Sequence, residues 1–114
     1  LIAKRPIANG AWRANENPNV HSAPTNYAEE YFRRAGIMTR LGDIIDEPKD
    51  RIMTSMGYIF SFNDIDVGII GTQNPKHLLS NIDMYSECLK ISREVISELN
   101  RRFDEFGKNW DQRT

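Results

Sequence analysis

Hydrophobic residues recur at helical spacing along four stretches of this chain, with polar residues between them. A spacing of three or four positions places such residues on one face of an α-helix, so each stretch predicts an amphipathic helix. The predicted helices run over about 27–39 and 48–62, from 75 onward, and over about 92–107. Their apolar stripes consist of Tyr31, Ala35 and Met38, then Ile52, Met56 and Ile59, then Leu78, Ile82 and Tyr85, and finally Val95, Leu99, Phe103 and Phe106.

Residues near the predicted helix ends and on their polar faces support these assignments. Asn26 can cap the first helix, with Glu29 as its capping-box partner three residues later. Pro48 suits the first position of the second helix, because a proline lacks the N–H that would have no partner there. In the last helix Glu98 and Arg102 are four positions apart, which predicts an ion pair on the side that faces solvent.

Two short apolar runs predict β-strands. One run covers 1–4 and the other covers 65–71, where Val67, Ile69 and Ile70 are β-branched. Both runs predict buried strands. Apart from Asp66 the second is continuously apolar rather than alternating, which is typical of a parallel sheet with helices outside it. Strands that alternate with helices predict an α/β fold, although two parallel strands do not make a stable sheet alone.

The stretch at 10–26 predicts a long loop between the first strand and the first helix. It follows the turn pair Asn9-Gly10 and contains Pro18 and Pro24. A loop of this length is typically either functional or mobile.

Composition narrows the class of protein. The chain has 114 residues, which is enough for one small domain, and its 39% of hydrophobic residues are too many for a fully disordered chain. The net charge of −1 excludes a basic nucleic-acid footprint, and no apolar run approaches the ~20 residues of a membrane span. A single cysteine fits a reducing, cytoplasmic setting, and the two histidines lack the companions of a zinc site, so no metal site is expected.

The chain begins at Leu1, without a methionine, and opens directly into a predicted strand. Natural domains usually open with a polar, poorly ordered end, so the sequence is either a trimmed chain or the later part of a longer protein. We interpret 1–114 as a single partial domain.

The strongest chemical signal lies where the second strand ends. A Gly-Thr pair at 71–72 makes a tight turn, and Asn74 and Pro75 cap and start a helix. The first turn of a helix leaves backbone N–H groups free, and the helix dipole favours negative charge there. Lys76 and His77 oppose that dipole, so either they help to bind an anion such as phosphate or they are solvated surface residues.

A second signal follows the first strand. Lys4 and Arg5 are basic residues at its carboxyl end, where α/β barrels place their binding loops. The alternative, which this signal taken alone favours, is a basic strand end that makes surface ion pairs.

The runs at 4–10 (Lys-Arg-Pro-Ile-Ala-Asn-Gly) and 69–82 (Ile-Ile-Gly-Thr-Gln-Asn-Pro-Lys-His-Leu-Leu-Ser-Asn-Ile) resemble the C-terminal third of bacterial aldo/keto reductases. The second run is similar to the pattern Gly-Thr-x-Asn-Pro-x-His-Leu-x-x-Asn at the eighth strand of that family. The run at 99–103 also resembles the family's ending. The resemblance covers nearly the whole chain and is weakest over the loop at 10–26.

This resemblance implies the C-terminal part of a (β/α)8 TIM barrel, with strands 7 and 8 and their helices, which is mostly helical as an isolated fragment. It also implies an NADP cofactor that binds in extended form without a Rossmann domain. NAD is the alternative, because His77 stands where many family members have Arg, and a histidine is only partly charged near neutral pH.

The resemblance further implies which residues meet the cofactor. The loop after the first strand lies along the nicotinamide and pyrophosphate, although Lys4 stands where the family stacks an aromatic ring. The segment after the second strand holds the 2′-phosphate and ribose, and Asn81 holds the adenine amino group. The implied cofactor-binding residues are Arg5, Pro6, Ile7, Ala8, Asn9, Gly71, Thr72, Gln73, Lys76, His77 and Asn81.

The family's catalytic Asp, Tyr, Lys and His lie on early strands, and no residue of this chain corresponds to them. We therefore expect a fragment of an NAD(P)H-dependent oxidoreductase that is inactive alone and whose parent transfers hydride to a carbonyl substrate. Exposed barrel edges predict oligomers, and neither nucleic acid nor a membrane is an expected partner. The alternative is a non-enzymatic helical interaction module, since four amphipathic helices can pack into a small bundle.

Overall fold

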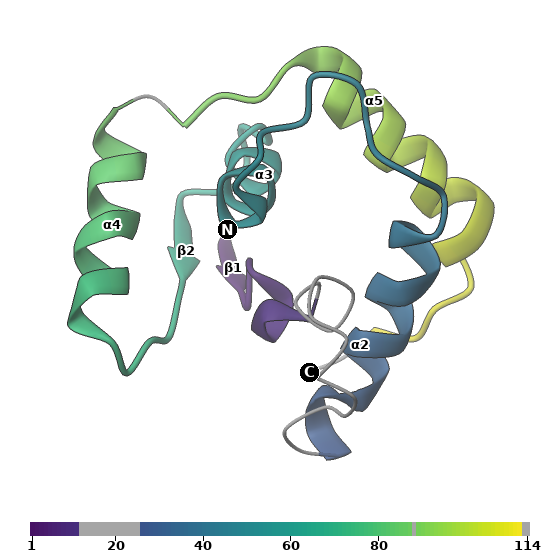
Figure 1. Ribbon diagram of the computed structural model, residues 1–114, viewed down its shortest axis with the longest axis horizontal. Helices are drawn as coiled ribbons and strands as arrows, with labels where there is room; N and C mark the ends of the chain where they lie inside the picture. Colours follow the sequence, from purple (N-terminus) through teal and green to yellow (C-terminus); the bar gives the residue numbers. More distant parts are fainter. Residues whose placement is uncertain (12–25, 88, 113–114) are drawn as a thin grey trace. The chain divides into compact units, whose positions relative to one another are not determined.

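The structure is a computed structural model that describes residues 1–11, 26–87 and 89–112 (Figure 1). The predicted loop at 10–26 lies mostly outside the described residues, as do His21 and Cys88. The chain divides into two compact units. The sheet unit consists of Leu1–Ala8 and Glu47–Ser92, and the helical unit consists of Asn9–Asp46 and Arg93–Thr114.

The two predicted strands form the sheet of the sheet unit. β1 (Ile2–Lys4) and β2 (Val67–Ile69) pair in parallel, with Ile2 opposite Val67 and Lys4 opposite Ile69. Each strand has three residues, fewer than the predicted runs. The parallel register brings the carboxyl ends of both strands to the same edge of the sheet.

In the sheet unit α3 (Arg51–Ile59) begins later than the predicted start at Pro48. Asp50 is its N-cap, and the Asp50 carboxylate accepts a hydrogen bond from the Ile52 N–H at 2.8 Å. This carboxylate satisfies one of the N–H groups that have no partner within the helix. The helix therefore starts at the residue after Asp50, and the predicted start at Pro48 is wrong.

α4 (Pro75–Ser86) begins where the sequence predicts. Asn74 is its N-cap, and the Asn74 side-chain oxygen accepts a hydrogen bond from the Lys76 N–H at 3.0 Å. Pro75 takes the first helical position. No residue of α4 is buried, although the sequence predicts an apolar stripe along it.

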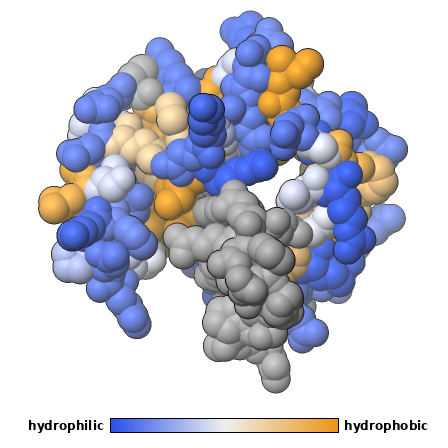
Figure 2. Space-filling model, viewed as in Figure 1, coloured by the Kyte–Doolittle hydropathy of each residue, from blue (hydrophilic) through white to orange (hydrophobic). Residues whose placement is uncertain are grey.

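The prediction that both strands are buried is wrong. The exposed fractions are 64% for Ile2, 48% for Val67 and 55% for Ile69, and the stripe residues of α4 are also more than half exposed. Two strands of three residues offer too few neighbours to cover both of their faces. Apolar surface therefore stays open over the α4 side of the sheet unit, as the orange areas on that side of Figure 2 show.

The helical unit contains α2 (Asn26–Thr39), α5 (Arg93–Arg102) and η2 (Phe103–Gly107), a π-helical turn that continues α5. The 3-10 turn η1 (Ala8–Gly10) lies where the chain passes from the sheet unit to the helical unit. The predicted helices at 27–39 and 92–107 are therefore present. The side chain of Asn26, the predicted cap of α2, lies outside the described residues.

Two residues of α5, one apolar and one charged, are buried in the helical unit. Val95 is 0% exposed, and Arg102 is 6% exposed. The Arg102 guanidinium donates hydrogen bonds to the Glu98 carboxylate at 2.8 Å and to the Met38 carbonyl at 3.1 Å. The predicted Glu98–Arg102 ion pair is confirmed. Its predicted position on the solvent side is wrong, because the Arg102 guanidinium is buried. The two acceptors compensate for the cost of burying this charge.

Arg34 joins α2 to the C-terminal segment of the helical unit. Its guanidinium lies 5.2 Å from the centre of the Trp110 ring and donates to the Asp111 carbonyl at 2.9 Å. It also donates to Glu30 at 2.6 Å. Hydrogen bonds from Arg33 and Arg34 lower the pKa of Glu30 to about 2, which keeps this carboxylate ionised well into the acid range.

Candidate functional site

The two segments predicted to hold a cofactor leave the same edge of the sheet. Lys4 and Ile69 are paired at the carboxyl ends of β1 and β2. The run from Arg5 to Ala8 follows the first strand, and the turn at 71–73 follows the second within a few residues. Parallel strands present their carboxyl-end loops together, so this edge is where a ligand could contact both segments.

The segment after β1 is a tight turn. The Ala8 N–H donates to the Arg5 carbonyl at 2.8 Å. Pro6, the second residue of this turn, is buried. Arg5 and Ala8 have φ of 57° and 45°, in the left-handed region that non-glycine residues seldom adopt. Such conformations cost energy and often occur at functional loops. The side chain of Asn9 lies outside the described residues.

The segment after β2 forms a short network of local hydrogen bonds before α4. The Thr72 hydroxyl accepts from the Asn74 N–H at 3.2 Å. The Asn74 side-chain oxygen accepts from the Lys76 N–H, and the Asn74 carbonyl accepts from His77 at 3.0 Å and from Leu78 at 3.2 Å. Pro75 has no N–H to offer.

These bonds correct the sequence-based interpretation of the helix start. Free backbone N–H groups were expected in the first turn of α4, but Asn74 and Pro75 leave none of them without a partner. An anion at this end of α4 therefore depends on side chains and on the turn at 71–73. Gly71, Thr72, Gln73, Lys76 and His77 are all exposed and accessible to such a ligand.

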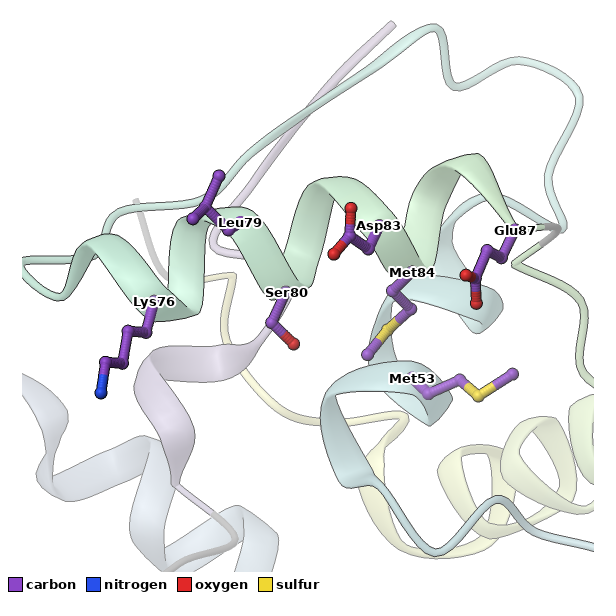
Figure 3. Close-up of a pocket in the computed structure, with 7 residues that line it drawn as sticks. All are labelled: Met53, Lys76, Leu79, Ser80, Asp83, Met84 and Glu87. Carbon is purple, nitrogen blue, oxygen red and sulfur yellow. The ribbon is translucent and has the colours of Figure 1, made fainter.

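Two grooves flank α4 within the sheet unit. The β2–α4 groove has a volume of about 370 Å³, and the α3–α4 groove, drawn in Figure 3, has a volume of about 600 Å³. Thr72 and Asn81 line the first groove, whereas Lys76 lines the second. The structure therefore brings Thr72 and Asn81 together and does not bring Lys76 to them. His77 lines neither of these two grooves.

The β2–α4 groove combines aromatic walls with a few polar groups. The rings of Phe60 and Tyr85 lie edge to face, with centroids 5.3 Å apart. Asp66, Thr72 and Asn81 provide its polar atoms. An apolar groove with a side-chain amide and a hydroxyl can hold a flat ring and satisfy its polar edge.

Sequence reasoning missed the aromatic wall of this groove. The sequence pattern places Tyr85 in the apolar stripe of a helix and gives Phe60 no role in the site. The available signal was their position on the two helices that flank a short strand ending in Gly-Thr. Such aromatic residues lie close to the carboxyl end of that strand once the helices pack beside it.

Neither metal chemistry nor a membrane span is found in the part of the chain that the structure describes. Residues 1–11, 26–87 and 89–112 hold no group of three or more His, Cys, Asp or Glu side chains that could bind a metal ion. Within the same ranges, no helix has both the length and the apolar character needed to cross a membrane. Comparison of the chain with protein-family models, with curated proteins and with solved structures finds no match in any of the three.

Proposed function

We propose that this chain carries part of the nicotinamide-cofactor site of an oxidoreductase that resembles the aldo/keto reductases. The observation that carries the proposal is the parallel register of β1 and β2, in which Lys4 lies opposite Ile69. This register pairs the first residues of the two runs, 4–10 and 69–82, in which the sequence resembles that family. The parent reaction would transfer hydride from the cofactor to a carbonyl substrate, in the barrel fold that the resemblance implies.

The β2–α4 groove supports binding of the adenosine end of the cofactor. Its ring walls and the Asn81 amide suit adenine, and Thr72 lines the same groove from the turn after β2. The exposed His77 is the side chain that we assign to the 2′-phosphate of NADP. Lys76 lines the α3–α4 groove instead, so we assign it no cofactor contact.

The chain's own residues would bind and orient the cofactor without moving protons. Arg5 to Asn9 would lie along the pyrophosphate and nicotinamide, and Gly71 to Gln73 would meet the ribose. A Cβ at Gly71 would meet no atom within 4 Å, so the backbone there is open to a ligand. We expect no carbonyl reduction by this chain alone with NADPH.

Nucleotide fragments test this proposal on the 114-residue chain itself. We expect calorimetry to detect adenosine 2′,5′-bisphosphate at a lower dissociation constant than 5′-AMP. His77→Ala should remove that difference, raising the dissociation constant of the bisphosphate about 10- to 100-fold, because a charge-assisted hydrogen bond is lost. Asn81→Leu should weaken both nucleotides equally, and Lys76→Ala is the matched control that should change neither. Absence of binding by either nucleotide at millimolar concentration would contradict the proposal.

A non-enzymatic interaction module is the second candidate, and the exposure of α4 favours it. Leu78, Leu79 and Ile82 are 51%, 62% and 51% exposed, so apolar surface is available for a partner. Association of the chain combined with failure to bind either nucleotide would favour this function over a cofactor site.

A further inference from the structure

One face of α4 carries four polar residues that the proposed cofactor site does not use. They are spaced by four, three and four positions, which places them on one side of a helix. Leu79 and Met84 flank them, and these six residues line the α3–α4 groove together with Met53 of α3 (Figure 3). The four polar residues are Lys76, Ser80, Asp83 and Glu87.

This face, which we call the α4 polar face, lacks partners within the described chain. Among the described residues, none forms an ion pair or a side-chain hydrogen bond with the side chains of Lys76, Asp83 or Glu87. The flanking Leu79 is 62% exposed. The groove therefore combines open apolar surface with charges that have no counterpart among the described residues.

The charges of the α4 polar face are arranged unfavourably for an isolated helix. Lys76 lies in the first turn, where the helix dipole is positive, and Glu87 is the C-cap, where it is negative. The first turn holds no acidic residue and the last turn holds no basic one. Each end thus repels its own charge, and a second helix running in the opposite direction would reverse both interactions.

We propose that two copies of this chain associate through the α4 polar face, with their α4 helices antiparallel about a two-fold axis between positions 81 and 82. In this register Lys76 of one copy lies level with Glu87 of the other, about 16 Å along the helix from its own Glu87. Ser80 lies level with Asp83 of the other copy, and its hydroxyl donates to that carboxylate. A two-fold axis makes each contact occur twice, as an isologous interface requires.

The flanking apolar residues complete the interface. In antiparallel helices the side chains on each flank of the contact line face their own symmetry copies. Met84 therefore faces Met84 of the second copy on one side, and Leu79 faces its equivalent on the other. Met53 borders the same groove, and unbranched methionine side chains adapt readily to a partner surface. Charge complementarity sets the register, and the apolar flanks supply buried area.

This interface is independent of the proposed cofactor site. Thr72 and Asn81 line the β2–α4 groove, on the other side of α4 from the groove that holds Lys76 and Glu87. Association is measured without nucleotide, so its failure would leave the cofactor proposal unaffected.

Charge reversal and mixing test the proposal on the whole 114-residue chain. Sedimentation equilibrium should show a monomer–dimer equilibrium that weakens as salt is added. Lys76→Glu alone and Glu87→Lys alone should each raise the dimer dissociation constant about 10- to 100-fold, because two attractive contacts become repulsive. An equimolar mixture of the two variants should form a heterodimer near wild-type affinity. One of its contacts pairs the two substituted side chains, which have opposite charges, and the other keeps the native pair of Lys76 and Glu87.

The controls separate this interface from unfolding and from other surfaces. Both reversals place a charge that the helix dipole favours, so circular dichroism should show no loss of helix in either variant. Lys108→Glu, an exposed substitution in the helical unit, should leave the dimer unchanged. A wild-type monomer at millimolar concentration would overturn the proposal. So would a dimer that survives both reversals, as pairing through the edges of β1 and β2 predicts, or single variants that fail to recover on mixing.

Discussion

α4 and α5 are helices of similar length whose charges are arranged in opposite ways. α4 has 12 residues, none of them buried, with a lysine in its first turn and a glutamate as its C-cap. α5 has 10 residues, buries Val95 and Arg102, and places Glu94 in its first turn and two arginines in its last. The first turn of α5 and its last turn before η2 therefore carry charges that a helix dipole favours, whereas the two ends of α4 do not.

The difference teaches that helical periodicity does not determine what stabilises a helix. α5 is held by contacts inside the helical unit, including the bond from Arg102 to the Met38 carbonyl. α4 has a side-chain N-cap and an apolar stripe, but none of its residues is buried. Four experiments test this comparison.

The largest expected effect is at Val95. We expect Val95→Ala to lower the free energy of unfolding by about 2–3 kcal/mol, because it leaves a cavity at a fully buried position. Leu79→Ala in α4 removes more atoms from a side chain that is 62% exposed and should cost less than about 0.5 kcal/mol. Urea unfolding followed by circular dichroism measures both, at concentrations below dimerisation, where Leu79 is exposed. Equal losses would mean that α4 is covered as well as α5.

Arg102→Met should have the next largest effect. It leaves the Met38 carbonyl without its guanidinium donor, and we expect a loss of about 1–2 kcal/mol of unfolding free energy. Arg101→Met is the matched control, because the Arg101 side chain is 55% exposed and its ion pairs with Glu98 and Glu105 are at the surface. It should cost less than about 0.5 kcal/mol in the same urea titration. Equal losses of unfolding free energy in the two variants would contradict the difference between a buried and an exposed arginine.

Reversing the charge in the first turn should change the stability of the two helices in opposite directions. Lys76→Glu should stabilise α4, and Glu94→Lys should destabilise α5, each by about 0.5 kcal/mol at low salt. Amide hydrogen exchange at concentrations below dimerisation reports the protection of each helix separately. Protection that changes in the same direction in both variants would contradict a dipole effect.

Acid titration should give the smallest effect, because the carboxylates concerned are partly exposed and screened. Hydrogen bonds from Arg101 and Arg102 lower the pKa of Glu98 from 4.5 to about 2. A pKa that is lower in the folded chain stabilises it above pH 4.5, and this contribution is lost as the pH falls toward 2.

The measurement is urea unfolding between about pH 5 and pH 2, the range in which this contribution is lost. Glu98→Gln should flatten the pH dependence of stability in this range. A slope that does not respond to Glu98→Gln would show that its arginine bonds do not persist in solution.

Local chemistry made the strand and helix positions predictable. Asn74 followed by Pro75 fixed the start of α4, and the two apolar runs identified β1 and β2. The start of α3 was not predictable from Pro48, because Asp50 competes for the same turn with a better acceptor. Burial was the least predictable property. The apolar residues Val67 and Ile69 show which side chains a strand could bury, but the pattern does not show whether other residues pack against them.

In the candidate site, too, some features were predictable from the sequence and others depended on packing. The resemblance assigned Thr72 and Asn81 to one site, and both line the β2–α4 groove. The sequence could not place Lys76, because adjacent positions on a helix point about 100° apart and only the packing of α3 decides which groove each one lines. It also predicted free N–H groups that the Asn74 cap in fact satisfies.

The register of β1 with β2 also sets an order of events in time. Ile2 pairs with Val67, which is 65 positions later in the chain. A ribosome adds about 5–20 residues each second, so β1 emerges about 3 to 13 s before its partner strand is made. Helices form within microseconds, which allows α2 and α3 to appear during that interval. Within the sheet unit α3 can therefore form before the sheet, and β1 remains an unpaired strand until β2 has been made.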